Sequence, residues 1–243
     1  MRIIYLDVLR GMAVLAMISY HFFWDLGFFG YIDFSLATTG FGLIIAQIIG
    51  SSFLLISGFS LNLSISSKSF QTRFWWRFLK LLSFSCLISV VTLIFDKNNF
   101  IFFGILHLLT FCSLLGFVIT KAKNTYFIFL ILLLTILISI TNFKFDLPIE
   151  FSWIGLNNIV PNTNDFYPVI PWIIFFLMGL WLGNVLTPTE LSSWKWSSHK
   201  NELLINGRIV KFLILSGRNS LLIYILHQPI FFSLFLVFNR IVS

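Results

Sequence analysis

Residues 126–141 read YFIFLILLLTILISIT, a run without a single charged side chain. A helix needs about 20 mostly apolar residues to cross the roughly 30 Å hydrocarbon core of a bilayer. Six more segments of this character lie along the chain. The sequence therefore predicts an all-α polytopic membrane protein with about seven transmembrane helices, at roughly 6–27, 41–64, 74–95, 100–120, 125–142, 168–186 and 217–238.

The composition excludes a soluble protein. Of the 243 residues, 58% are apolar and only 10% are charged, whereas a soluble domain carries about 25% charged residues. The net charge of +7 is dispersed in short basic groups between apolar runs, without the basic arm or stripe typical of nucleic-acid binding. We therefore expect one transmembrane domain over residues 1–243, surrounded by lipid and without a nucleic-acid partner.

The distribution of Lys and Arg predicts the orientation. If the N-terminus is cytoplasmic, all of the 16 Lys and Arg residues except Lys97, Lys144 and Arg240 fall on the cytoplasmic side. This asymmetry follows the positive-inside rule. The basic segment 191–212 is either an interfacial helix or an ordinary amphipathic loop.

Three histidines, His21, His107 and His227, lie inside predicted spans, where an ionisable side chain is costly. At about 1.5 Å per helical residue, they lie about 16, 21 and 13 Å from the cytoplasmic edge. A polar cavity shared by the three residues explains this common depth. The alternative is that each histidine ties two helices together. No metal site is expected, because metal-ligand spacing is lacking.

Asp25 follows His21 at i+4, one turn further along the same helix face. A carboxylate there can orient the imidazole and raise the basicity of its second nitrogen, as in acyl-transfer sites. His21 is thus a candidate base and Asp25 its partner.

Charged residues also lie at the cytoplasmic ends of two spans. Asp7 and Arg10, at i+3, are expected to pair, and Gly11 lets another group approach the backbone closely. Arg218 follows Gly217 at the start of the seventh span. These arginines are either topology anchors or ligands for phosphate, which guanidinium groups suit. On the outer side, Asp165 and Tyr167 precede the sixth span and are candidates to bind a polar acceptor.

Five blocks in chain order resemble the small prokaryotic members of the heparan-α-glucosaminide N-acetyltransferase family of membrane acyltransferases. They read LDVLRG at 6–11 leading to His21 and Asp25, SFLLISG at 52–58, FGILH at 103–107, DFYPVIPW at 165–172, and GRNSL at 217–221 leading to His227-Gln228-Pro229. The first block is also similar to the acyltransferase-3 family, in which such a histidine is taken as the base.

The resemblance implies transfer of an acyl group, expected to be acetyl, from cytoplasmic acetyl-CoA across a bacterial plasma membrane to a sugar hydroxyl or amine outside. It leaves homodimer formation open. Residues 22–40 contain no histidine, unlike the luminal loop of the lysosomal branch, so the base must be His21 or His107. The site residues it implies are His21, Asp25 and His107 for catalysis, Arg10, Arg218, Ser57, His227 and Gln228 for the CoA donor and the central site, and Asp165, Tyr167 and Trp172 for the acceptor.

Two other classes of function remain open from the residues alone. A small proton-coupled transporter would use the buried histidines as a proton relay. Inverted repeats would favour that alternative, and none is apparent in the sequence. A non-catalytic membrane subunit is the third alternative.

Overall fold

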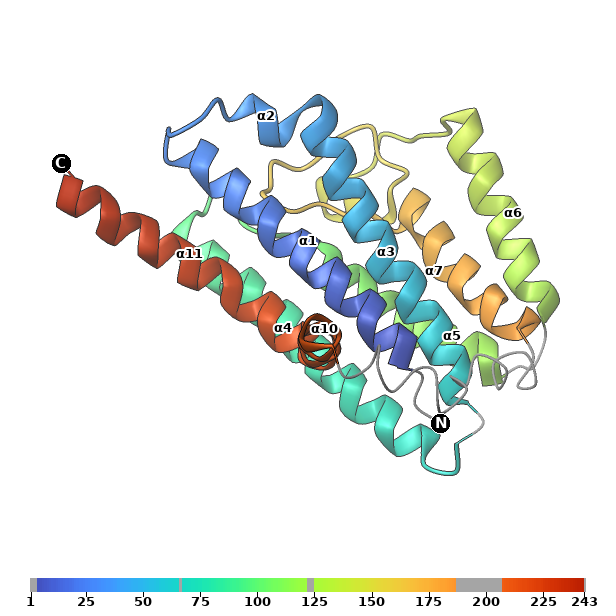
Figure 1. The fold of residues 1–243 in the computed structure, drawn as a ribbon. Coiled ribbons are helices and arrows are strands. Elements are labelled where there is room, and N and C mark those ends of the chain that lie inside the picture. Colours follow the sequence, from blue (N-terminus) through green and yellow to red (C-terminus); the bar gives the residue numbers. More distant parts are fainter. Residues whose placement is uncertain (1–3, 66, 122–124, 187–206, 243) are drawn as a thin grey trace. The chain divides into compact units, whose positions relative to one another are not determined.

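The computed structural model describes residues 4–65, 67–121, 125–186 and 207–242 (Figure 1). These residues form helices and connecting loops, without a named strand among them. The helices are α1 (Ile4–Phe28), α2 (Ser35–Thr38), α3 (Gly40–Ser64), α4 (Phe70–Phe95), α5 (Ile105–Lys121), α6 (Thr125–Thr141), the 3-10 helix η1 (Ile149–Ile154), α7 (Val169–Val185), α10 (Arg208–Arg218) and α11 (Ser220–Val242).

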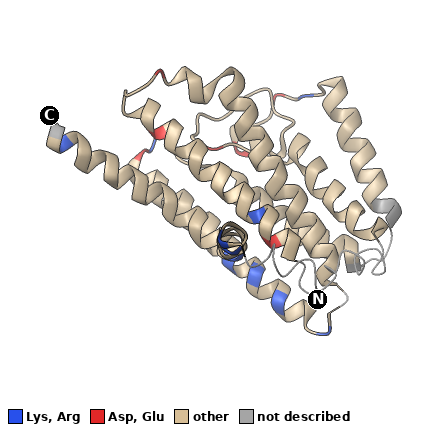
Figure 2. Cartoon of the chain, viewed as in Figure 1, with Lys and Arg blue, Asp and Glu red and all other residues tan. Residues whose placement is uncertain are grey.

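The predicted all-α membrane fold is confirmed. Four helices are long and apolar enough to cross a membrane: Ile4–Phe28, Gly40–Ser64, Phe70–Phe95 and Ser220–Ile241. The other three predicted spans correspond to shorter apolar helices at Ile105–Thr120, Ile128–Thr141 and Val169–Val185. Charged residues are sparse along these helices, apart from the first half of α4 (Figure 2). The predicted orientation of the chain in the membrane stays a prediction.

Several predicted boundaries differ from the structure. The third span begins at Phe70 rather than at 74, and the last ends at Val242 rather than at 238. The seventh span does not begin at Gly217, because residues 208–218 form the separate helix α10, which ends at the Asn219 C-cap. The fourth begins at Ile105 rather than at 100, since Phe103 forms an isolated bridge with Phe166 and its carbonyl accepts the Tyr167 N–H at 3.0 Å. Part of the predicted interfacial segment, residues 191–206, lies outside the described residues.

The chain divides into two compact units. The terminal unit comprises residues 2–53 and 188–243, and the central unit comprises residues 54–187. In the terminal unit α1 packs against α10 and α11, and in the central unit α6 packs on α7 and α4 on α5.

Close helix contacts in the central unit depend on glycine. A Cβ added to Gly58 of α3 would lie 2.1 Å from the Phe176 carbonyl oxygen of α7. One added to Gly179 of α7 would lie 2.1 Å from the Leu55 carbonyl oxygen of α3. Small residues of this kind let helix backbones approach each other in membrane proteins. Around this crossing Phe176, Leu177 and Leu180 are fully buried.

Candidate active site

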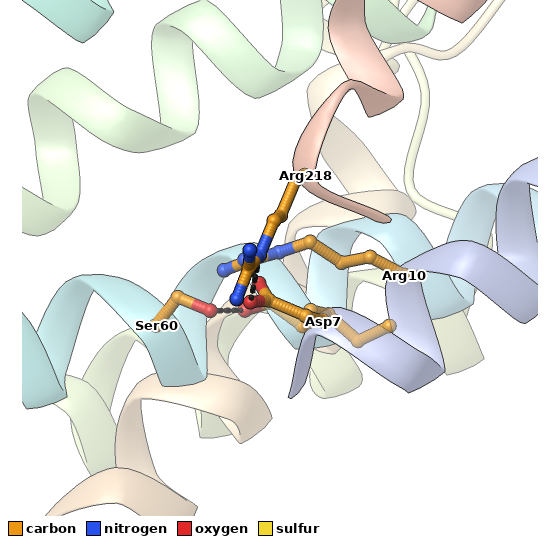
Figure 3. A network of polar contacts seen from close by, with 5 residues as sticks. Asp7, Arg10, Ser60 and Arg218 are labelled. Atoms are coloured by element: carbon orange, nitrogen blue, oxygen red, sulfur yellow. Dashed lines mark hydrogen bonds and ion pairs between the residues drawn. The ribbon is translucent and has the colours of Figure 1, made fainter. Parts of the chain in front are cut away.

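In the terminal unit, one buried carboxylate binds two arginines (Figure 3). Asp7 Oδ1 lies 3.2 Å from Arg10 Nη1, and Asp7 Oδ2 lies 3.5 Å from Arg218 Nε. The Asp7 side chain is 3% exposed, whereas that of Arg218 is 46% exposed. The predicted Asp7–Arg10 pair is confirmed. The carboxylate of Asp7 therefore contacts two guanidinium groups.

Two glycines allow α1 and α10 to form this cluster. A Cβ on Gly217 would lie 1.8 Å from the Asp7 carbonyl oxygen, and one on Gly11 would lie 2.1 Å from the Leu213 carbonyl oxygen. Neither helix therefore accepts a larger residue at the crossing without moving. The close approach predicted at Gly11 is confirmed, and Leu213 of α10 is the group that makes it.

Further along α1, His21 faces His227 of α11. Their ring centroids are 4.7 Å apart, and the ring planes are inclined by 58°. Aromatic contacts on the same two helices hold this face together, among them Phe22 with Phe231 at 5.7 Å and Phe28 with Phe232 at 5.5 Å. Two of the three intramembrane histidines thus lie side by side.

One helical turn beyond His21, the fully buried Asp25 contacts Gln228. Gln228 Nε2 donates a hydrogen bond to Asp25 Oδ1 at 2.7 Å. From the sequence, His21 was the predicted partner of Asp25. The i+4 spacing puts both residues on one face of α1, but α11 supplies the partner that the Asp25 carboxylate binds in the structure.

Three buried polar atoms around this contact have no hydrogen-bond partner within the described residues. They are Asp25 Oδ2, Gln228 Oε1 and His227 Nε2. A buried polar atom left without a partner costs about 1–3 kcal/mol, so such atoms are rare in folded proteins. Their concentration on α1 and α11 is typical of a site that a ligand or ordered water completes.

His107 belongs to the central unit, where both of its ring nitrogens have partners. The Gly104 backbone N–H donates to Nδ1 at 3.3 Å, and Nε2 lies 3.0 Å from Ser89 Oγ. Ser89 Oγ also donates to the Ile101 carbonyl at 2.7 Å. The Nδ1 contact makes Nε2 the protonated nitrogen of the neutral ring. The shared cavity predicted for all three histidines, and a catalytic role for His107, stay predictions.

Asp165 binds the beginning of α5. Its Oδ2 accepts the Ile105 backbone N–H at 3.0 Å, which satisfies one of the unpaired donors at the helix N-terminus. A Cβ on Gly104 would lie 2.1 Å from the same oxygen, so glycine is required there. Burial raises the pKa of Asp165 to about 6, and the Ile105 hydrogen bond lowers it less.

The other predicted acceptor and donor residues also lie in the central unit. The rings of Tyr167 and Trp172 pack edge to face at 4.7 Å between centroids. Ser57 Oγ accepts a hydrogen bond from Arg77 at 3.1 Å. The contacts of Ser89 and Arg77 could not be predicted from the sequence, because no spacing along the chain indicates contacts between helices.

The terminal unit therefore contains Arg10, His21, Asp25, Arg218, His227 and Gln228, six of the predicted site residues. The central unit contains Ser57, His107, Asp165, Tyr167 and Trp172. The roles predicted for these residues are not tested by the fold.

Comparison with known proteins gives one family. The catalytic-domain model of heparan-alpha-glucosaminide N-acetyltransferase matches residues 2–229. No curated protein and no solved structure matches the chain. Because the match covers nearly the whole sequence and both units, the chain belongs to the heparan-alpha-glucosaminide N-acetyltransferase family and is a membrane protein of the acetyltransferase type.

Proposed function

We propose that this protein transfers an acetyl group from acetyl-CoA, held at the cytoplasmic face of a bacterial plasma membrane, to a hydroxyl or amine of a sugar on the other side. The observation that carries the proposal is the arrangement on α1 and α11. A cluster of Asp7, Arg10 and Arg218 lies at one end of α1. A histidine pair lies further along it, beside polar atoms that have no hydrogen-bond partner in the described part of the chain.

The charged cluster suits the phosphates of CoA. The guanidinium groups of Arg10 and Arg218 both contact the Asp7 carboxylate, and about half of the Arg218 side chain is accessible. Guanidinium groups bind phosphate oxygens through several parallel hydrogen bonds. Ser57, which we also assign to donor binding, belongs to the central unit.

The spacing along α1 suits the length of the donor. Arg10 and His21 are 11 residues apart, which corresponds to about 16 Å along a helix. The extended pantetheine arm of CoA can bridge such a distance between its phosphates and its thioester. A donor bound by Arg10 and Arg218 would therefore present the acetyl group near the histidine pair.

In the proposed reaction, His21 is the base. It takes the proton of the sugar hydroxyl or amine while the nucleophile forms a bond to the acetyl carbonyl carbon. The carbon–sulfur bond of the thioester then breaks, and the proton passes to the sulfur, so that free CoA thiol leaves. Asp25 and Gln228 would hold the nucleophile through their unpartnered oxygens, because a hydroxyl or an amine supplies donors.

The two substrates are proposed to arrive from opposite sides. The Lys and Arg asymmetry places Arg10 and Arg218 on the cytoplasmic side, where CoA is made. It places the segment 165–172 on the other side, where Asp165, Tyr167 and Trp172 would contact the sugar. The acetyl group thus crosses the membrane while the CoA moiety stays inside.

The test uses the purified protein in sealed vesicles of known orientation, with labelled acetyl-CoA at the cytoplasmic face. Glucosamine or neutral hexoses are supplied only at the opposite face, and acetylated sugar and free CoA thiol are measured. The His21→Ala variant should lose about 10²-fold or more in turnover, the contribution expected of a general base. Arg218→Ala should weaken acetyl-CoA binding, whereas Arg208→Ala, an exposed residue of the same helix, is the matched control.

The results separate the alternatives. Product formation only when donor and sugar share a compartment would refute transfer across the bilayer. Uptake of acetyl-CoA or sugar without release of free thiol would favour the transporter. Unchanged acetyl-CoA binding in both Arg10→Ala and Arg218→Ala would make these arginines topology anchors.

A further inference from the structure

We propose that His227 is the relay partner of His21: its Nε2 receives a proton from the His21 ring as His21 takes the proton of the acceptor. This inference rests on the proposed acetyl transfer and assigns a role in it to a second residue. His227 acts through His21 and does not itself touch the reacting atoms.

The hydrogen bond at Nδ1 fixes the tautomer of His227. Nδ1 lies 2.6 Å from the backbone carbonyl oxygen of Tyr224, one turn earlier in α11. A carbonyl oxygen only accepts hydrogen bonds, so Nδ1 must carry the proton. In the neutral ring Nε2 is then bare and presents a lone pair.

That lone pair is buried and available. His227 is 7% exposed, and its Nε2 has no hydrogen-bond partner among the described residues. His107, in contrast, uses both nitrogens in contacts with Gly104 and Ser89. His227 thus retains the one feature that a proton acceptor needs, an unoccupied basic nitrogen shielded from water.

His21 lies where its ring can donate a proton to His227. The two ring centroids are 4.7 Å apart, close enough for a hydrogen bond between ring nitrogens once they face each other. Catalytic hydrogen bonds are often long in the free enzyme and shorten when substrate binds. The Asp25–Gln228 pair lies beside this contact, where its carboxylate favours a transient positive charge on the histidines.

Each proton that moves in the proposed reaction has a donor and an acceptor. The acceptor's proton goes to the bare nitrogen of His21, and the proton on the other His21 nitrogen goes to His227 Nε2. His227 becomes an imidazolium whose Nδ1–H still bonds the Tyr224 carbonyl. When the carbon–sulfur bond of acetyl-CoA breaks, both transfers reverse, the thiolate takes the proton, and both histidines return to neutral.

Two substitutions separate this role from a structural one. The Asn amide nitrogen occupies the position of Nδ1, so His227→Asn keeps the bond to Tyr224 and removes Nε2. The Gln amide reaches the position of Nε2 but takes no proton. We expect both variants to lose about 10²-fold in kcat, within the range of acid–base catalysis, with KM for acetyl-CoA and the melting temperature unchanged.

Either variant retaining more than about a tenth of parental kcat would overturn the relay, because a proton acceptor contributes at least about 10²-fold. A second measurement does not depend on turnover. Nitrogen-15 NMR of histidine-labelled protein, with His227→Asn for assignment, should show a protonated Nδ1 and a bare Nε2 at His227. The reverse tautomer would also overturn the inference. A parent protein that transfers no acetyl group would instead refute the proposed function.

Discussion

Asp165 should make the protein less stable as the pH rises from about 4 to about 6. In the folded chain, burial of its carboxyl raises its pKa to about 6 from an ordinary value of 3.8. Between these two values the folded chain retains a proton that the unfolded chain has released. The free energy of unfolding therefore falls across this window. Above it, Asp165 is ionised in both states and causes no further change.

The magnitude follows from the two pKa values. At about 1.4 kcal/mol per pH unit, the gap between 3.8 and 6 amounts to about 3 kcal/mol. Solvent reaches part of the side chain and reduces this value, so we expect about 2–3 kcal/mol. For a chain of this length, such a change shifts the melting temperature by about 4–12 °C.

The assay compares the parent with Asp165→Asn. An asparagine oxygen can still accept the Ile105 N–H, so the variant keeps this hydrogen bond. Its amide has no carboxyl group that could titrate. Thermal unfolding of the detergent-solubilised proteins is followed from pH 4 to pH 8. The variant should match the parent at pH 4 and exceed it in stability at pH 7. A difference that stays constant across this range, or one of the opposite sign, would refute the reasoning.

Two further substitutions test the packing of each unit. Gly217→Ala forces a Cβ against the Asp7 carbonyl and should cost about 1–3 kcal/mol of stability by overpacking, measured by thermal melting. Leu215→Ala, at a 60% exposed position of α10, is the control in the same experiment. His107→Ala removes two hydrogen bonds and should destabilise the protein by about 2 kcal/mol. Ser89→Ala also removes two hydrogen bonds and should cost a similar amount. Loss of turnover in His107→Ala at an unchanged melting temperature would instead support the predicted catalytic role.

The helices of this protein could be predicted from sequence because lipid imposes a strong local rule. A segment that crosses a bilayer must satisfy its own backbone, so a long apolar run indicates a helix. The same locality made the Asp7–Arg10 pair predictable, since residues three apart share a helix face. The separate helix α10 was not predicted, although the polar residues 216–220, Ser-Gly-Arg-Asn-Ser, interrupt the apolar run where α10 ends and α11 begins.

Contacts between distant segments lay beyond sequence reasoning. Asp25 and Gln228 are 203 positions apart, and Asp165 and Ile105 are 60 apart. Helical periodicity places Asp25 on the face of His21 but does not reveal which other helix offers a donor. The partner of Asp25 therefore could not be predicted from the sequence, and the roles of these site residues stay predictions.

The predicted depth in the membrane identified the histidines as candidates, but it does not show which of them can accept a proton. His107 and His227 lie at comparable predicted depths, yet their chemistry differs because their neighbours differ. A backbone N–H donates to Nδ1 of His107, whereas a backbone carbonyl accepts from Nδ1 of His227. The first contact leaves a protonated Nε2 that Ser89 binds. The second leaves a basic Nε2 that is buried and has no partner in the part of the chain that the structure describes. The direction of one hydrogen bond thus decides which histidine can accept a proton, and this direction depends on side-chain orientation rather than on position along the helix.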